Sequence, residues 1–220
     1  RILMDLKGID ILTTDPCVLT VRNCLVVPTS VFQGGIWTGF QARSTIIMEG
    51  NTFDLRAIAG TDNPSRAVLQ RVGALGLTFR NNAFIVPSDQ QYTVLSDGVN
   101  TDTLTFTNNG YLLGSQLKVV QSYNDGSTIA DRTFAQWRSL GKDSNSFTSS
   151  NLVIGIDYRP ASGSPLIGTG INIGPLADYS GTVFAVRDDI GAYEFIPTSI
   201  FDFTYVTSVF QYETGRFAPP

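Results

Sequence analysis

The sequence contains no histidine, and this absence limits the chemistry that its residues can perform. Its 220 residues include only two cysteines and three lysines, and charged residues make up 15% of the chain. Without histidine, Ser-His-Asp and Cys-His catalysis are excluded within the chain, as are zinc sites that use histidine ligands. The lysines, Lys7, Lys118 and Lys142, leave few candidates for a lysine base.

Other scarce features narrow the class of partner. No apolar run approaches the roughly 18 residues that a membrane-spanning helix requires, so we expect no membrane insertion. The formal net charge of −4 disfavours nucleic acid and anionic membranes as main partners. Between Cys17 and Cys24 the chain looks extended and would span about 23 Å, which is beyond disulfide reach. We therefore expect both cysteines to be unpaired.

Short stretches of the chain repeat one another. Leu77–Phe84 (LTFRNNAF) recurs as Leu104–Tyr111 (LTFTNNGY), with looser copies at Ile46–Phe53 and Leu19–Val26. The equivalent positions are Cys24, Asn51, Asn82 and Asn109, at steps of 27, 31 and 27 residues. A period of this length indicates a repeat architecture, and the unit reads strand, Asn-rich corner, strand, with no helical pattern. The sequence therefore predicts an all-β fold, a parallel β-solenoid in which each repeat is one coil.

Stacked coils would bring equivalent residues together. Leu77 and Phe79 alternate with polar residues, as in a strand with one buried face, and would lie beside Leu104 and Phe106. The corner residues Asn51, Asn82 and Asn109 would form a ladder of side-chain amides, and asparagine tolerates the left-handed backbone of a sharp corner. The alternative is a set of antiparallel hairpins with a common turn sequence. Its usual spacing of about 8 to 12 residues is much shorter than the observed period.

Three regions follow one another along the chain. Residues 1–126 carry the coils, residues 127–195 hold a short capping helix and a closing segment, and residues 196–220 form an extended, aromatic-rich tail. Long polar segments within the coils are predicted as loops on one face, at 28–41, 56–66 and 87–102. The tail packs either on the flank of its own coils or on a partner or copies of itself.

The capping helix has local signals at both ends. Thr133 to Gln136 fits a capping box, and Gly141 follows the helix end. Phe134, Trp137 and Leu140 fall on one side of the helix, which predicts a lid over the last coils. An aromatic platform for a ligand at Trp137 is the alternative.

Two segments near the end carry a resemblance to a known family. They are residues 157–170 (DYRPASGSPLIGTG) and residues 187–194 (RDDIGAYE), which follow the helix motif FAQW at 134–137 and the linker KDSNS at 142–146. Over residues 70–195 the chain resembles the C-terminal region of right-handed parallel β-helix proteins of the pectate-lyase-like superfamily. This resemblance implies a right-handed coil. It also favours carbohydrate as a ligand, because such proteins include secreted polysaccharide lyases and hydrolases, bacterial surface proteins and phage tailspikes. It does not assign a reaction.

Carboxylates provide the candidates for catalysis. Glycosidases need two carboxyl groups at defined separation, and Asp97 and Asp102 lie in one loop where they could converge. The same loop also reads as an ordinary Asp/Gly/Asn turn. Asp188, Asp189 and Glu194 form the densest acidic cluster. The resemblance implies that they cap backbone donors, although their oxygens could also bind Ca²⁺. We expect no other metal or cofactor, and whether the chain is an enzyme stays open.

Sugar binding without catalysis requires less of the sequence. Aromatic faces stack on sugar rings while amides bind hydroxyl groups, and candidates for these roles lie in or beside the predicted loops: Trp37, Tyr92, Tyr111 and Gln90. Each residue taken alone also fits the core or an ordinary surface. As a set they predict a glycan-binding groove.

Together these features predict a β-helix protein of an extracellular or virion surface that recognises surface polysaccharide, in the manner of a phage tailspike or fibre. The partners would be polysaccharide and other copies or subunits bound through the tail. One alternative is a secreted polysaccharide lyase or glycoside hydrolase whose catalytic coils precede Arg1. Another is a purely structural shaft or filament subunit.

Overall fold

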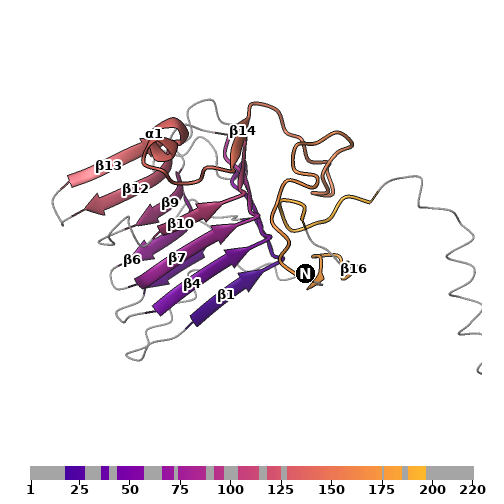
Figure 1. Cartoon of the computed structure of the whole chain (residues 1–220), viewed down its shortest axis with the longest axis horizontal. Coiled ribbons are helices and arrows are strands. Elements are labelled where there is room, and N and C mark those ends of the chain that lie inside the picture. The colour runs from indigo at the N-terminus through magenta and orange to yellow at the C-terminus, as the bar shows by residue number, and fades with distance from the viewer. Residues whose placement is uncertain are drawn as a thin grey trace, which may run out of the picture.

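The computed structural model is described for eleven stretches of the chain, shown in colour in Figure 1. They are residues 18–27, 36–39, 44–56, 66–71, 74–87, 92–96, 104–113, 118–124, 128–174, 176–184 and 188–196. Gln90, Asp97, Asp102 and the predicted tail beyond residue 196 lie outside these residues. No helix among the described residues is long and apolar enough to cross a membrane.

Most strands lie in three sheets, and the chain visits the sheets in turn (Figure 1). The first sheet has the order β1 (Val18–Arg22), β4 (Ser44–Glu49), β7 (Ala74–Arg80), β10 (Leu104–Thr107). The second has the order β14 (Phe147–Ser149), β11 (Gly110–Leu112), β8 (Ala83–Ile85), β5 (Thr52–Asp54), β2 (Leu25–Val26). The third has the order β13 (Thr128–Thr133), β12 (Lys118–Asn124), β9 (Tyr92–Ser96), β6 (Arg66–Arg71), β3 (Ile36–Gly39).

Neighbouring strands in these sheets run parallel, except for the antiparallel pair of β12 and β13. A small separate pair, β15 (Leu176–Ala177) and β16 (Val183–Phe184), is also antiparallel. The described helix is α1 (Phe134–Ser139). The predicted all-β structure of parallel strands with one short helix is therefore confirmed.

Each round of the chain has one strand more than the repeats predicted. The repeated unit of strand, corner and strand corresponds to the first and second sheets. Two strands of the third sheet lie where the sequence predicted loops, with β3 inside 28–41 and β9 inside 87–102. These segments do not resemble one another in sequence, so the repeat contained no sign of a third sheet.

The register brings equivalent residues of successive repeats side by side. Leu77 pairs with Leu104 and Phe79 with Phe106, as predicted. The same alignment runs through all four repeats, since Val21 pairs with Met48 and Met48 pairs with Phe79. Like residues thus meet like residues in the core, as expected for parallel strands that repeat in sequence.

Aromatic rings fill the space between the sheets. The ring of Phe84 stacks on Phe53 at 5.1 Å and on Tyr111 at 5.4 Å, and Phe79 stacks on Phe106 at 4.8 Å. All belong to one buried apolar cluster. Because offset-stacked rings add to the free energy of burial, this column stabilises the register as well as the core.

The helix α1 covers the last round of the core. Thr133 is its N-cap, and the capping box predicted with Gln136 is present. Trp137 is fully buried and meets Phe106 edge-on at 5.3 Å, while Phe134 packs on Tyr111. Trp137 therefore belongs to the core, and a ligand platform at this ring is excluded by its burial. Leu140, predicted on the same side, is instead exposed because the helix ends before it.

Each corner between the first and second sheets is made by two adjacent residues with different roles. The first of them takes the left-handed backbone conformation, with φ of 54° at Asn23, 56° at Asn81 and 52° at Asn108, and Gly50 takes this place in the second repeat. The second residue of each pair is the ladder residue. The sequence predicted both tasks for the ladder asparagine, whereas the structure gives the left-handed conformation to its neighbour.

The ladder residues are linked by buried hydrogen bonds. Nδ2 of Asn51 donates to Oδ1 of Asn82 at 3.0 Å, and Nδ2 of Asn82 donates to Oδ1 of Asn109 at 3.1 Å. Each of these Oδ1 atoms also accepts the backbone N–H of the preceding ladder residue. The ladder ends on Asp143 and Ser146, which bind the side chain and the backbone N–H of Asn109.

The closing segment, which comprises the described residues between 164 and 194, lies along these corners. The left-handed asparagines hold it through its backbone: Asn108 donates to Thr169 O, Asn23 donates to Ala177 O, and Asn81 both donates to Ile171 O and accepts Ile171 N–H. A Cβ on Gly170 would lie 2.8 Å from Cγ of Asn81, so the close approach requires glycine there.

Candidate functional site

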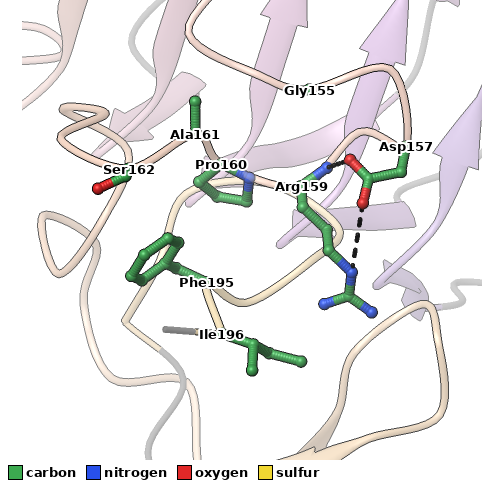
Figure 2. A pocket seen from close by; sticks show the side chains of 8 residues that line it. All are labelled: Gly155, Asp157, Arg159, Pro160, Ala161, Ser162, Phe195 and Ile196. Atoms are coloured by element: carbon green, nitrogen blue, oxygen red, sulfur yellow. Dashed lines mark hydrogen bonds and ion pairs between the residues drawn. The ribbon is translucent and has the colours of Figure 1, made fainter. Parts of the chain in front are cut away.

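A cavity of about 420 Å³ lies where residues 155–162 meet Phe195 and Ile196, which follow the closing segment (Figure 2). Its lining residues are Gly155, Asp157, Arg159, Pro160, Ala161, Ser162, Phe195 and Ile196. Pro160, Phe195 and Ile196 supply apolar surface. Charged and hydroxyl side chains of the 157–162 segment supply polar groups. Apolar walls with a few polar groups are typical of small-molecule sites.

A tight turn presents Asp157 and Arg159 to this cavity. The N–H of Gly155 donates to Arg159 O at 2.8 Å, and the N–H of Tyr158 donates to Gly155 O at 3.0 Å. Tyr158 has a φ of 66°, a conformation that costs a tyrosine free energy. Gly155 has no Cβ, and one placed there would lie 2.7 Å from Oδ1 of Asp157. The turn therefore depends on particular residues at particular places.

The side chain of Tyr158 offsets the strain of its backbone. Its hydroxyl group donates to Oδ2 of Asp54 at 2.7 Å, and the Arg56 guanidinium lies over its ring at 5.8 Å. Arg56 also binds both oxygens of Asp54, a buried residue at the end of β5. These contacts attach the turn to the second sheet at the residue that stands between Asp157 and Arg159.

The same contacts set the ionisation of Asp54. Burial acts to raise the pKa of this carboxyl group, but hydrogen bonds from Arg56 and Tyr158 outweigh it and hold the pKa below its ordinary value. Burial and the adjacent Asp54 raise the pKa of Tyr158, so its hydroxyl group keeps its proton as a donor. Asp54 is thus an ionised carboxylate that accepts hydrogen bonds from Arg56 and from Tyr158, and it anchors the turn to the second sheet.

Arg159 is held by several acceptors at once. Its backbone N–H donates to Oδ1 of Asp157 at 3.2 Å, and its Nε lies 3.7 Å from Oδ2 of the same residue (Figure 2). Its Nη1 donates to Glu194 O at 3.2 Å and lies 3.6 Å from Oδ2 of Asp178. Its guanidinium lies over the ring of Tyr193 at 5.1 Å. The cation is therefore oriented and its charge is already balanced.

The acidic cluster predicted near the end of the chain does come together. One oxygen from each of Asp188, Asp189 and Glu194 lies within 4.8 Å of the others, so the trio could hold a metal ion. Both carboxylate oxygens of Asp189 accept hydrogen bonds from the backbone, one from the N–H of Gly168 and the other from the N–H of Phe195. These bonds match the capping role that the resemblance implied, and they hold the backbone of Phe195 at the edge of the cavity.

Among the residues predicted to bind carbohydrate, Tyr111 is the one whose side chain the structure describes. Tyr111 was expected to face a ligand, but it is fully buried in β11, and its hydroxyl group donates to Asp143. Its ring contacts those of Phe84 and Phe134, so no sugar can reach it and the prediction was wrong.

The other predicted ligand residues lie elsewhere. Trp37 lies in β3 and Tyr92 begins β9, on either side of β6 in the third sheet. Gln90, like Asp97 and Asp102, is outside the described residues. These positions stay predictions, because the side chains of all five residues lie outside the described part of the structure.

The sequence alone did not indicate this cavity. The segment from Asp157 to Pro160 was noticed only for its resemblance to a closing motif. A strained, non-glycine turn residue cannot be read from residue type, and the contact of Tyr158 with Asp54 spans 104 positions. The one sign of a site in the sequence was the run of an acidic, an aromatic and a basic residue at Asp157, Tyr158 and Arg159.

Comparisons with known proteins do not assign the chain to a family. No protein-family model matches the chain, and neither does any curated protein or solved structure. The function must therefore be argued from the fold and from the cavity.

Proposed function

We propose that this chain is a right-handed parallel β-helix protein of an extracellular or virion surface, and that it recognises polysaccharide through the cavity beside Arg159. The order of strands supports the coil, because β1, β2 and β3 are followed by β4, β5 and β6 in the same three sheets. Parallel strands joined by a crossover are nearly always connected in the right-handed sense. The resemblance to the pectate-lyase-like superfamily points the same way.

The observation that carries the binding proposal is the composition of the cavity. The Phe195 ring and Ile196 offer apolar surface on which the C–H face of a sugar ring can lie. Asp157, whose side chain is 60% exposed, can accept hydrogen bonds from hydroxyl groups, while Arg159 and Ser162 can donate them. A sugar has both kinds of surface, whereas a purely apolar ligand would leave the charged groups unpaired.

Binding can be tested by passing the full chain over immobilised bacterial and plant polysaccharides and titrating retained glycans as soluble oligosaccharides. Phe195→Ala should weaken binding about tenfold, since a stacked ring contributes roughly 1.5 kcal/mol. Arg159→Met should weaken it at least as much. Arg138→Met is the matched control, because Arg138 lies on α1 and does not line the cavity.

The outcome also separates the alternatives. Release of reducing or unsaturated ends from a bound polysaccharide would identify an enzyme instead of a binding protein. If no polysaccharide is retained, or if Phe195→Ala binds as well as the parent chain, the proposed site is wrong.

A structural shaft is a second candidate, and the asparagine ladder favours it. A continuous buried ladder and a stacked aromatic column make a stiff rod without any need for a ligand. We further propose that copies associate through the aromatic residues of the tail. Light scattering of the full chain against a version ending at Ile196, which keeps the cavity lining, tests this: an unchanged mass per particle would contradict it.

A further inference from the structure

We infer that the cavity beside Arg159 selects neutral, hydroxyl-rich sugars over sugars that carry carboxylate groups, an inference that rests on the proposed polysaccharide recognition. An arginine in a sugar site would ordinarily indicate an acidic ligand, because guanidinium and carboxylate form strong paired hydrogen bonds. The surroundings of Arg159 argue for the opposite preference.

The charge of Arg159 is already matched by the protein. Asp157 and Asp178 both lie within 4 Å of its guanidinium, at 3.7 Å and 3.6 Å. Asp178 is itself fixed, since its Oδ1 accepts the backbone N–H groups of Ser180 and Thr182. A ligand carboxylate would have to displace one of these partners or lie beside it, and like charges held together at a binding site are costly.

Three further carboxylates lie close to the backbone that leads into Phe195. Asp189 accepts the N–H of Phe195, and Asp188 and Glu194 lie with it in one acidic cluster. Within the lining Asp157 balances Arg159, so the acidic cluster and the net charge of −4 leave an excess of negative charge that disfavours anions.

Hydroxyl groups suit the same surroundings. The exposed carboxylate of Asp157 can accept hydrogen bonds from them, and Ser162 can donate or accept. Arginine has several N–H donors, and among the described residues Nη2 of Arg159 makes no hydrogen bond, which leaves donors for a sugar oxygen. Phe195 and Ile196 then meet the apolar face of the ring.

The test compares matched ligands on one sugar skeleton that differ chiefly in charge. Oligogalacturonides and their fully methyl-esterified forms share one skeleton, and neutral hexose oligosaccharides of equal length extend the panel. Affinity for the full chain is measured by NMR titration at low and at high NaCl concentration. We expect the neutral member of each pair to bind at least about tenfold more tightly than the acidic member. This difference in affinity, the gap between the two ligands, should narrow at high salt because the repulsion is screened.

Asp157→Asn supplies the second measurement. Because this side chain is exposed, the substitution should leave the fold intact, and the loss of its charge should narrow the gap between neutral and acidic ligands several-fold. Asp131→Asn is the charge-matched control, since it removes one negative charge from β13 in the third sheet. That variant should keep the gap of the parent chain.

Each outcome decides one question. Tighter binding of the free acid, or an unchanged gap in Asp157→Asn, would overturn the selectivity while leaving polysaccharide recognition in place. If neither neutral nor acidic ligands bind, the proposed function itself fails. Tighter binding of neutral ligands together with a narrowed gap supports both.

Discussion

The side-chain amide of Asn82 donates to Oδ1 of Asn109 at 3.1 Å, although 27 positions separate the two residues. Both side chains are fully buried. This contact joins two successive corners, and it is repeated between Asn51 and Asn82. The ladder therefore couples each round of the chain to the next through groups that water does not reach.

Removing one member should cost more than a single hydrogen bond. In Asn82→Ala, the backbone N–H and the side chain of Asn51 lose their acceptor, and Met48 O loses its donor. We expect the free energy of unfolding to fall by about 2–4 kcal/mol, because buried polar groups are left unpaired. Urea unfolding measures this, and Asn145→Ala, at an exposed position, is the control. A loss below about 0.5 kcal/mol would show that the ladder contributes little.

Asn81 should control the closing segment and not the stack. Asn81→Gly preserves the left-handed backbone but removes both side-chain hydrogen bonds to Ile171. We expect faster hydrogen exchange at the N–H of Ile171, while exchange at Ala83 and Gly110 stays as in the parent chain. Equal acceleration at all these amides would mean that the segment and the stack unfold together.

Asp143 should make stability depend on pH in an unusual direction. Burial raises the pKa of this carboxyl group, despite hydrogen bonds from Ser146, Tyr111 and Asn109. A carboxyl group with a raised pKa in the folded state destabilises the fold once it ionises. This penalty is absent below the unfolded-state pKa and complete above the folded-state pKa, so the contribution to stability falls as pH rises between them.

The variant Asp143→Asn isolates that contribution. Its free energy of unfolding should vary less between about pH 3 and pH 7 than that of the parent chain, because the buried titration is gone. Thermal unfolding across this range measures the difference. If the two profiles are parallel, Asp143 does not titrate as its burial requires.

The contact between Tyr158 and Asp54 should link the cavity to the second sheet. Tyr158→Phe removes one hydrogen bond to a charged group, and we expect a loss of about 1.5–3 kcal/mol together with weaker glycan binding, because Asp157 and Arg159 flank this residue. Tyr179→Phe is the control, since its hydroxyl group has no hydrogen bond among the described residues. Weaker stability with unchanged binding would separate the anchor from the site.

The same variant should change the acid limit of stability. Because the pKa of Asp54 is lowered in the folded state, its ionised form stabilises the fold at any pH above its unfolded-state pKa. This contribution is lost as the pH falls through the folded-state pKa. Without the Tyr158 donor that folded-state pKa rises toward its ordinary value, so the loss begins at higher pH. Acid unfolding of both chains shows whether the midpoint moves upward.

Much of the stack could be predicted because its signal is periodic. Residues 77–84 and 104–111 share five of eight positions, and parallel pairing of their strands aligns them in register, as Leu77 with Leu104. The helix was also predictable from local sequence, through the capping box of Thr133 and Gln136. The third sheet gave no such signal, since its strands differ in sequence and both β3 and β9 occur within segments that look like polar loops.

Residue order alone sets the repeat, the register of the first two sheets and the absence of histidine chemistry. The folded arrangement decides which aromatic rings are accessible and where the cavity forms. Tyr111 is buried because Phe134 of α1 and Asp143 cover it. The turn at Tyr158 holds its strained shape because Asp54 and Arg56 meet it from the end of β5. Burial and long-range contacts arise only when distant segments pack together, and for that reason a local pattern does not reveal them.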